Sequence, residues 1–261
     1  MKWTIRKVRQ CKGGEPLGLV TAYDYVTARF AARAGVPLVL VGDSLATTAL
    51  GHSTTLPATM DAMIHHAEAV RRGAPEALVV GDMPFLSYTT VEDAVRNAGR
   101  FLREAGCDAV KLEGGVSKAP AIAALVAEGI PVQAHIGLQP QSVKSTGYAV
   151  RGRTPDDAAA LGRDLDAVCE AGAFSVVLEG VVPEVAAELT ARSPIPTIGV
   201  GAGSGCDAQY LVLADLLGLG DGPVPKFAKS YARLADEAVA AISAYMAEVS
   251  SRAFPDAGHS Y

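Results

Sequence analysis

Six apolar runs in this chain each end at a polar or ionisable residue, and those residues are the candidates for chemistry. A parallel α/β barrel places its active site at the carboxyl ends of its strands. Six such residues in register therefore predict a polar ring around one mouth of a barrel. The residues are Asp24, Asp43 with Ser44, Asp82, Lys111 with Glu113, His135 and Glu179.

Three of these residues, Asp43, Asp82 and Glu113, supply carboxylates at three different strand ends. Hard oxygen donors suit Mg²⁺ or Mn²⁺, whereas thiolates or paired histidines would indicate zinc. Mg²⁺ is usually held by one or two carboxylates together with water and substrate oxygens, so three candidates suffice. An isolated acid of this kind is more often a turn or helix-cap residue, but three of them beside Lys111 favour a metal site.

Lys111 lies between Val110 and Leu112, and the two-residue period of a strand places it on the same face as Glu113. A buried lysine is costly unless it is paired. Three roles remain open: a structural ion pair with a carboxylate, binding of an anionic substrate, and formation of a Schiff base.

Glu179 follows the apolar run Val176-Val177-Leu178. Desolvation at the rim of such a strand raises the pKa of a carboxyl group, which suits a general base. His135 could donate a hydrogen bond to a developing oxyanion, although a lone histidine at a strand end is more often structural. We therefore assign Glu179 the catalytic role and His135 a possible supporting one.

The elements that must position these residues alternate along the chain. The recurring turns Arg33-Ala34-Gly35, Glu104-Ala105-Gly106 and Glu170-Ala171-Gly172 each precede a strand-like run. This alternation predicts an α/β fold, a single (β/α)₈ TIM barrel. The expected strands lie near residues 18–23, 38–43, 78–82, 109–113, 131–136, 175–179 and 196–200, with a weaker eighth near 212–218.

Length and composition agree with one domain over residues 1–261. The 261 residues approach the roughly 250 typical of a TIM barrel, and no linker divides the chain. Residues from about 225 to 250 carry apolar side chains at steps of three and four, which predicts an amphipathic C-terminal helix. It is expected to pack on its own barrel or, alternatively, at a subunit interface.

The charge pattern excludes several classes of partner. The formal net charge is −5 and acids and bases are interspersed, so we expect neither nucleic-acid nor membrane binding. The first residues lack the apolar core of a signal peptide, and we expect a cytoplasmic protein. The four cysteines form no C-x-x-C pair and are expected to be reduced structural thiols.

Ordered motifs along nearly the whole chain resemble the ketopantoate hydroxymethyltransferase family. They are Thr21-Ala22-Tyr23-Asp24-Tyr25, Val41-Gly42-Asp43-Ser44-Leu45, Thr55-Leu56-Pro57, Asp82-Met83-Pro84-Phe85, Val110-Lys111-Leu112-Glu113-Gly114-Gly115, Pro140-Gln141-Ser142-Val143, Val177-Leu178-Glu179, Ile198-Gly199-Val200-Gly201-Ala202-Gly203 and Pro225-Lys226-Phe227.

The resemblance implies a barrel of the phosphoenolpyruvate/pyruvate-type superfamily, assembled into a homo-oligomer that is commonly a decamer. It implies transfer of a hydroxymethyl group from 5,10-methylenetetrahydrofolate to 2-oxoisovalerate, through a metal-stabilised enolate, for pantothenate synthesis. By position, Asp43, Asp82 and Glu113 match the Mg²⁺ ligands, and Asp43, Ser44, Asp82 and Lys111 match the keto-acid contacts. Glu179 matches the general base.

The chain departs from the family pattern at several loop and pocket positions, which are Ala46, Thr47, Ala149, Gly180, Ala208 and Ala214. These departures leave open that a different 2-oxo acid is hydroxymethylated in a specialised pathway. A metal-dependent lyase or decarboxylase on the same fold is a further alternative, although the Lys-Arg-Cys-Gly-His loop typical of such enzymes is absent. A catalytically silent binding barrel is the third.

Overall fold

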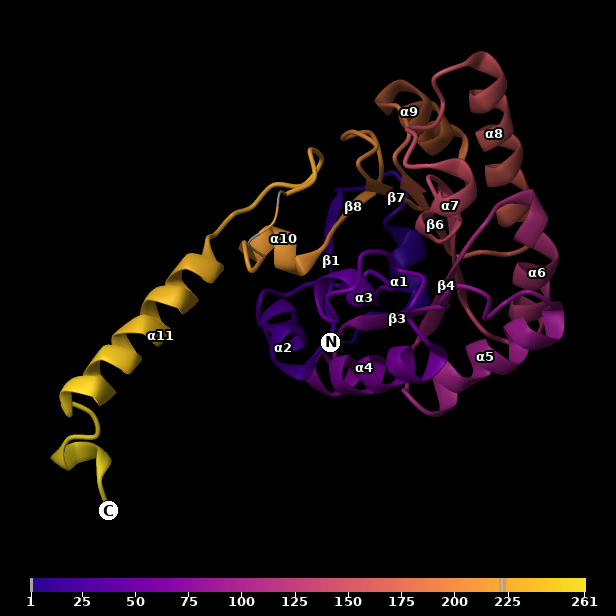
Figure 1. The fold of residues 1–261 in the computed structure, drawn as a ribbon. Coiled ribbons are helices and arrows are strands. Elements are labelled where there is room, and N and C mark those ends of the chain that lie inside the picture. Colours follow the sequence, from indigo (N-terminus) through magenta and orange to yellow (C-terminus); the bar gives the residue numbers. More distant parts are fainter. Residues whose placement is uncertain (1, 221, 223) are drawn as a thin grey trace. The chain divides into compact units, whose positions relative to one another are not determined.

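The computed structural model describes residues 2–220, 222 and 224–261. The chain divides into two compact units, Met1–Leu211 and Val212–Tyr261. The first unit is a closed barrel of eight parallel strands with helices between them (Figure 1), which confirms the predicted (β/α)₈ fold. The expected single domain over residues 1–261 stays a prediction.

The strands of the barrel pair in chain order, and β1 pairs with β8 to close it. Their side chains are buried almost throughout, as expected for parallel strands covered on both faces. The strands are β1 (Leu17–Thr21), β2 (Leu38–Val41), β3 (Leu78–Asp82), β4 (Ala109–Glu113), β5 (Val132–Gly137), β6 (Ser175–Glu179), β7 (Thr197–Val200) and β8 (Ala208–Leu211).

Helices occupy most of the connections between these strands. Those of the first unit are α1 (Ile5–Gln10), α2 (Tyr25–Arg33), α3 (Leu45–Thr48), α4 (Met60–Gly73), α5 (Val91–Arg103), α6 (Ala119–Ala127), α7 (Val143–Thr146), α8 (Pro155–Glu170) and α9 (Pro183–Arg192), with the 3₁₀ turns η1 (Val116–Lys118) and η2 (Pro140–Ser142). Thr59 and Thr90 cap α4 and α5 through their side chains. Gly35, Gly106 and Gly172 have positive φ, as the repeated helix-to-strand turns require.

The predicted eighth strand near residues 212–218 is wrong. The strand is β8, at Ala208–Leu211, and Leu213–Leu217 forms the helix α10. A short apolar run fits a buried strand and a buried helix turn equally well. Gly218 ends the helix in the left-handed conformation, which stops the run after five residues.

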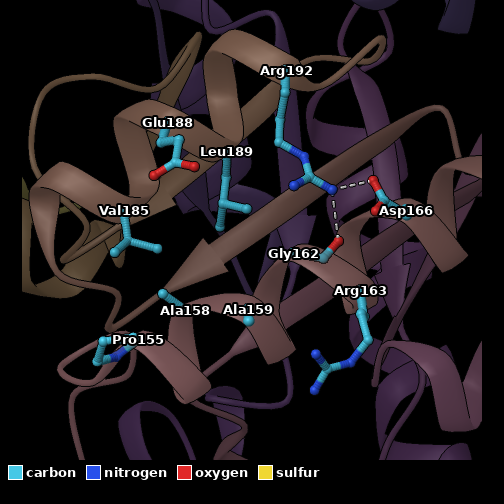
Figure 2. Close-up of a pocket in the computed structure, with 10 residues that line it drawn as sticks. All are labelled: Pro155, Ala158, Ala159, Gly162, Arg163, Asp166, Val185, Glu188, Leu189 and Arg192. Carbon is cyan, nitrogen blue, oxygen red and sulfur yellow. Dashed lines mark hydrogen bonds and ion pairs between the residues drawn. The ribbon is translucent and has the colours of Figure 1, made fainter.

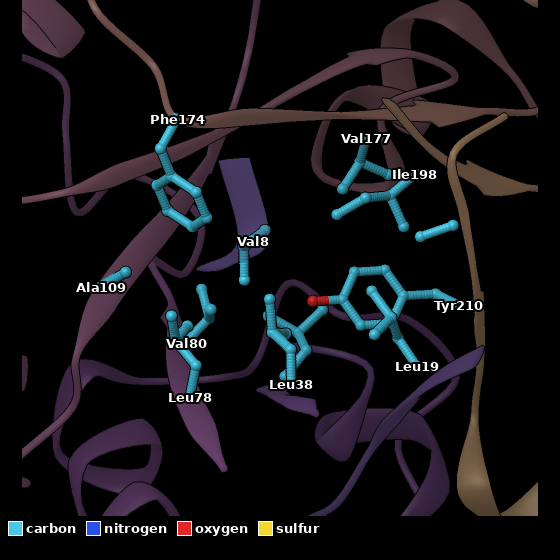
Figure 3. Packing of buried hydrophobic residues seen from close by; sticks show 12 residues of the cluster. Val8, Leu19, Leu38, Leu78, Val80, Ala109, Phe174, Val177, Ile198 and Tyr210 are labelled. Carbon is cyan, nitrogen blue, oxygen red and sulfur yellow. The ribbon is translucent and has the colours of Figure 1, made fainter. Parts of the chain in front are cut away.

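Apolar side chains fill the amino-terminal end of the barrel. Val8 of α1 lies in one cluster with Leu38 and Leu78, which begin β2 and β3, and with Phe174, which precedes β6 (Figure 3). Burial of such side chains from several strands stabilises the closed sheet. The carboxylate, lysine and histidine side chains of the strands lie instead toward the carboxyl end.

The second unit contains the C-terminal helix, α11 (Leu234–Ser251), and the 3₁₀ turn η3 (Ala257–His259). The helix begins at Leu234 rather than near residue 225. Tyr231 N donates to Leu216 O, and Ser230 Oγ donates to Asp215 O, so the preceding segment bonds to α10 instead of extending α11. None of the described helices has the length and apolar character to cross a membrane.

Alanine favours a helix more than glycine does, but the packing of α4 against α2 predicts that alanine at Gly73 is destabilising. A Cβ at Gly73 would lie 2.6 Å from Tyr25 O and 2.7 Å from Ala28 Cβ, whereas a Cβ at Gly99 in α5 would meet nothing within 4 Å. Gly73→Ala should lower the free energy of unfolding by about 1–3 kcal/mol. Gly99→Ala should raise it by about 0.5–1 kcal/mol. Urea unfolding measures both, and a stabilised Gly73→Ala would contradict this packing.

Candidate active site at the carboxyl end of the barrel

A buried ion pair joins the ends of β3 and β4. Lys111 Nζ lies 2.6 Å from Asp82 Oδ1, and the backbone N–H of Asp43 donates to Asp82 Oδ2 at 3.1 Å. Lys111, Asp82 and Asp43 are each at most 5% exposed. Three neighbouring strand ends therefore meet through one carboxylate, as the alignment of parallel strands predicts.

Gln141, in η2 after β5, bridges two of the predicted metal ligands. Its side-chain Nε2 donates to Asp43 Oδ2 at 2.9 Å, and its backbone N–H donates to Glu113 Oε2 at 3.1 Å. Tyr88 Oη donates to Gln141 Oε1 at 2.6 Å and fixes the amide orientation. Neither Gln141 nor Tyr88 was expected at the site, because both lie in loops beyond the strands.

His135 lies between two carboxylates. Its Nδ1 is 3.7 Å from Glu113 Oε1, and its Nε2 is 3.4 Å from Glu179 Oε2. Burial and the nearby Lys111 lower the pKa of His135 well below its ordinary value, so the ring is neutral. Neither ring nitrogen has a hydrogen-bond partner among the described residues, so the side chain lies between the two carboxylates without bonding to either.

The carboxylates hold an excess of negative charge that burial opposes. Desolvation, followed by repulsion from Asp82, raises the pKa of Asp43 to about 7. Desolvation also raises the pKa of Glu113 well above its ordinary value and that of Glu179 to about 8. Burial opposes the charge of Lys111, but Asp82, Glu113 and Asp43 together raise its pKa. The raised pKa of Glu179 is the direction expected for a general base at an apolar rim.

The structure brings together all the predicted site residues except one member of the ring. Asp24 is exposed and caps α2, where its Oδ1 accepts from Thr27 N, because the backbone leaves the barrel before it. The others lie at the carboxyl ends of β2 to β6 or just beyond them. They are Asp43, Ser44, Asp82, Lys111, Glu113, His135 and Glu179.

Two pockets differ in their relation to this site. One of about 390 Å³ lies between α8 and α9, away from the polar ring, where Arg192 bonds to Gly162 O and pairs with Asp166 (Figure 2). The other, of about 370 Å³, is lined by Gly137, Leu138, Ala149 and Arg151 among others. Leu138 N donates to the backbone carbonyl of Glu179 at 2.7 Å, so this second pocket lies next to the end of β6.

The carboxylates of the site are not arranged around a common point where a metal ion would lie. Within the described part of the chain, no three carboxylate, imidazole or thiol groups are grouped so as to hold a metal ion. Asp82 is turned to Lys111, and Asp43 to Gln141. Glu113 Oε1, however, is buried and has no hydrogen-bond partner among the described residues.

Two solved structures share the fold of this chain. The chain resembles 2,3-dimethylmalate lyase, a member of the phosphoenolpyruvate mutase/isocitrate lyase superfamily, with a TM-score of 0.64 at 19% identity over 98% of this chain and 88% of that one. Phosphoenolpyruvate phosphomutase from Streptomyces platensis gives a TM-score of 0.63 at 16% identity over 95% and 88%. These likenesses show that the chain has the same barrel fold as these two enzymes.

The sequence comparisons identify the family. The family model for ketopantoate hydroxymethyltransferase matches residues 2–257. The 3-methyl-2-oxobutanoate hydroxymethyltransferase of Chloroflexus aurantiacus is 52% identical over all of this chain and 93% of its own length. That of Moorella thermoacetica is 53% identical over 95% and 93%. The chain belongs to the ketopantoate hydroxymethyltransferase family and is a transferase.

Burial of Glu179 predicts a pH-dependent stability in the metal-free protein. Folding raises the pKa of this carboxyl from 4.5 to about 8, so the native state loses stability relative to the unfolded chain as the pH rises between these values. Glu179→Gln should match the wild type near pH 4.5 and exceed it by on the order of 2 kcal/mol at pH 7, allowing for the partly exposed side chain.

Urea unfolding at several pH values measures this difference. Glu170→Gln, which removes an exposed carboxylate at the end of α8, is the matched control. A Glu179→Gln difference that stays constant with pH would contradict the assignment.

Proposed function

We propose that the chain transfers a hydroxymethyl group from 5,10-methylenetetrahydrofolate to 2-oxoisovalerate, which forms ketopantoate. The observation that carries this proposal is the group of three buried carboxylates and the partly exposed Glu179 around Lys111 at one end of the barrel. Membership of the family supports the choice of substrates. Assembly into a homo-oligomer stays a prediction.

The donors at this site suit a divalent cation. Asp43, Asp82 and Glu113 offer hard oxygen ligands, and the unpartnered Glu113 Oε1 is a buried acceptor that a cation would satisfy. These three residues would hold Mg²⁺, with the 2-oxo acid supplying further oxygens. The ion would act as a Lewis acid that polarises the 2-oxo group.

The chain's own residues supply the proton transfer. Glu179, ionised, takes the proton from C3 of the 2-oxo acid, and its raised pKa makes it a stronger base than an exposed glutamate. Lys111 offsets the negative charge that then develops on the substrate. His135 is neutral, and its Nε2 lies 3.4 Å from Glu179 Oε2, where the ring can donate one hydrogen bond during the reaction.

Attack of the resulting carbon nucleophile on the one-carbon unit requires a second substrate beside Glu179. The pocket of about 370 Å³ at Gly137 and Arg151 adjoins this residue and offers that space. The departures from the family pattern include Ala149, which lines the same pocket. The proposal therefore places the folate donor on the loop that follows β5.

Proton exchange tests the first half of the reaction without folate. In D₂O with Mg²⁺, the wild type should replace the C3 proton of 2-oxoisovalerate by deuterium. The loss of the C3 signal in proton NMR measures the exchange rate. Glu179→Gln should lower the exchange rate at least 100-fold, because no other carboxylate takes its place, while the 2-oxo acid still binds. Glu170→Gln should exchange at the wild-type rate.

The exchange experiment also distinguishes the alternatives. Exchange with another 2-oxo acid but not with 2-oxoisovalerate would identify a different substrate. Unchanged exchange in Glu179→Gln would overturn the role of the base, and no exchange with any 2-oxo acid would overturn the proposed function.

Gln141 should position the metal ligands. Gln141→Ala removes the amide that holds Asp43 and keeps the backbone N–H that holds Glu113, so it should weaken Mn²⁺ binding about 10-fold. Electron paramagnetic resonance of free Mn²⁺ measures this affinity directly. Gln139→Ala in the same loop is the control and should bind as the wild type does; equal affinities of the two variants would contradict the bridging role.

A further inference from the structure

The hydroxyl of Tyr23 lies between two other hydroxyl groups at the same end of the barrel. Thr21 Oγ1 donates to Tyr23 Oη at 2.9 Å, and Tyr23 Oη is 2.8 Å from Ser44 Oγ. Thr21 ends β1, and Ser44 lies three residues beyond β2. A short chain of hydroxyls therefore runs from one strand end toward a residue of the candidate site.

Both ends of the Tyr23 residue are held in place. Its side chain is 7% exposed, and its backbone carbonyl accepts a hydrogen bond from His66 Nδ1 of α4 at 2.5 Å. Ala22 N donates to Leu40 O in β2. The backbone around Tyr23 is thus held by β2 and α4, and the phenol is buried and bonded to Thr21 and Ser44.

Ser44 uses its side chain in an unusual way for its position. It is the N-cap residue of α3, where a serine hydroxyl ordinarily accepts from a backbone N–H of the first turn. Its side chain makes no such bond. The orientation of the Ser44 hydroxyl is therefore set by Tyr23 rather than by the helix.

The hydroxyl group of a tyrosine carries one hydrogen. Tyr23 Oη accepts from Thr21 Oγ1, and either oxygen of the Tyr23–Ser44 pair can donate to the other. The proposal takes the arrangement in which Tyr23 donates to Ser44 Oγ. The hydrogen of Ser44 is then left to donate to another acceptor, and the half-buried side chain stands beside Asp43 at the end of β2.

We propose that Tyr23 is a positioning residue that directs the hydroxyl hydrogen of Ser44 toward an oxygen of the bound 2-oxo acid. This inference rests on the proposed function and deepens it. The acceptor is an anionic carboxylate or the 2-oxo oxygen, since both lack hydrogens and accept well. Tyr23 therefore contributes to binding of the 2-oxo acid, and the removal of the C3 proton remains the task of Glu179.

A double-mutant cycle with the exchange reaction tests this role. The concentration of 2-oxoisovalerate at half-maximal exchange and the maximal rate are measured in D₂O with Mg²⁺ for the wild type, Tyr23→Phe, Ser44→Ala and the double variant. Tyr23→Phe should raise the half-saturating concentration about 3- to 10-fold, with a maximal rate within about twofold of the wild type. Ser44→Ala should behave similarly.

The double variant should be no worse than Ser44→Ala alone, because the phenol acts through the serine. Tyr25→Phe, which removes the hydroxyl of a half-exposed tyrosine in α2, is the matched control and should leave both parameters unchanged. A structural role would instead lower the melting temperature and give losses in Tyr23→Phe and Ser44→Ala that multiply in the double variant.

The possible outcomes separate the two levels of the proposal. No exchange in the wild type overturns the proposed function and this inference with it. Exchange in the wild type with an unchanged Tyr23→Phe, or with multiplying losses, overturns the inference alone. Should Tyr23→Phe fail to fold, Thr21→Val removes the donor that orients the phenol; a raised half-saturating concentration supports the inference, and an unchanged one overturns it.

Discussion

The ion pair between Lys111 and Asp82 is the interaction on which the candidate site depends. It brings a cation within 2.6 Å of a carboxylate in the interior of the barrel, where an unpaired charge of either sign would be strongly destabilising. Asp43 and Glu113 gather around the same pair and are held by Gln141. Four carboxyl groups lie around one lysine. A divalent cation would offset their excess negative charge and so allow an anionic 2-oxo acid to bind.

The barrel keeps this concentration of charge at one end and an apolar cluster at the other. Val8, Leu38 and Phe174 belong to an apolar cluster at the amino-terminal end, and pairing of β1 with β8 closes the sheet. The cost of burying the carboxylates and the lysine of the strands therefore falls toward their carboxyl ends. Hydrogen bonds from Tyr88 and Gln141 reduce that cost, while Glu113 and Glu179 keep pKa values raised by desolvation.

Sequence patterns predicted the strands that are continuous apolar runs ending in a charged residue, such as the one that leads to Asp82. They placed the eighth strand wrongly, since Leu213–Leu217 is a short, mostly apolar run whose length fits a strand as well as a helix turn. Asp24 follows a strand as the others do, but it caps a helix. The contributions of Gln141 and Tyr23 come from hydrogen bonds between loops and strands far apart in sequence, which no local spacing reveals.

The most direct test of the account is a crystal structure with Mn²⁺ and 2-oxoisovalerate, read through the anomalous scattering of the metal. The account predicts one strong anomalous peak per chain at Asp43, Asp82 and Glu113, with oxygens of the 2-oxo acid among the ligands of the metal and Glu179 facing C3. A 2-oxo acid bound at this mouth with no metal there, or a metal bound elsewhere in the chain, would contradict it.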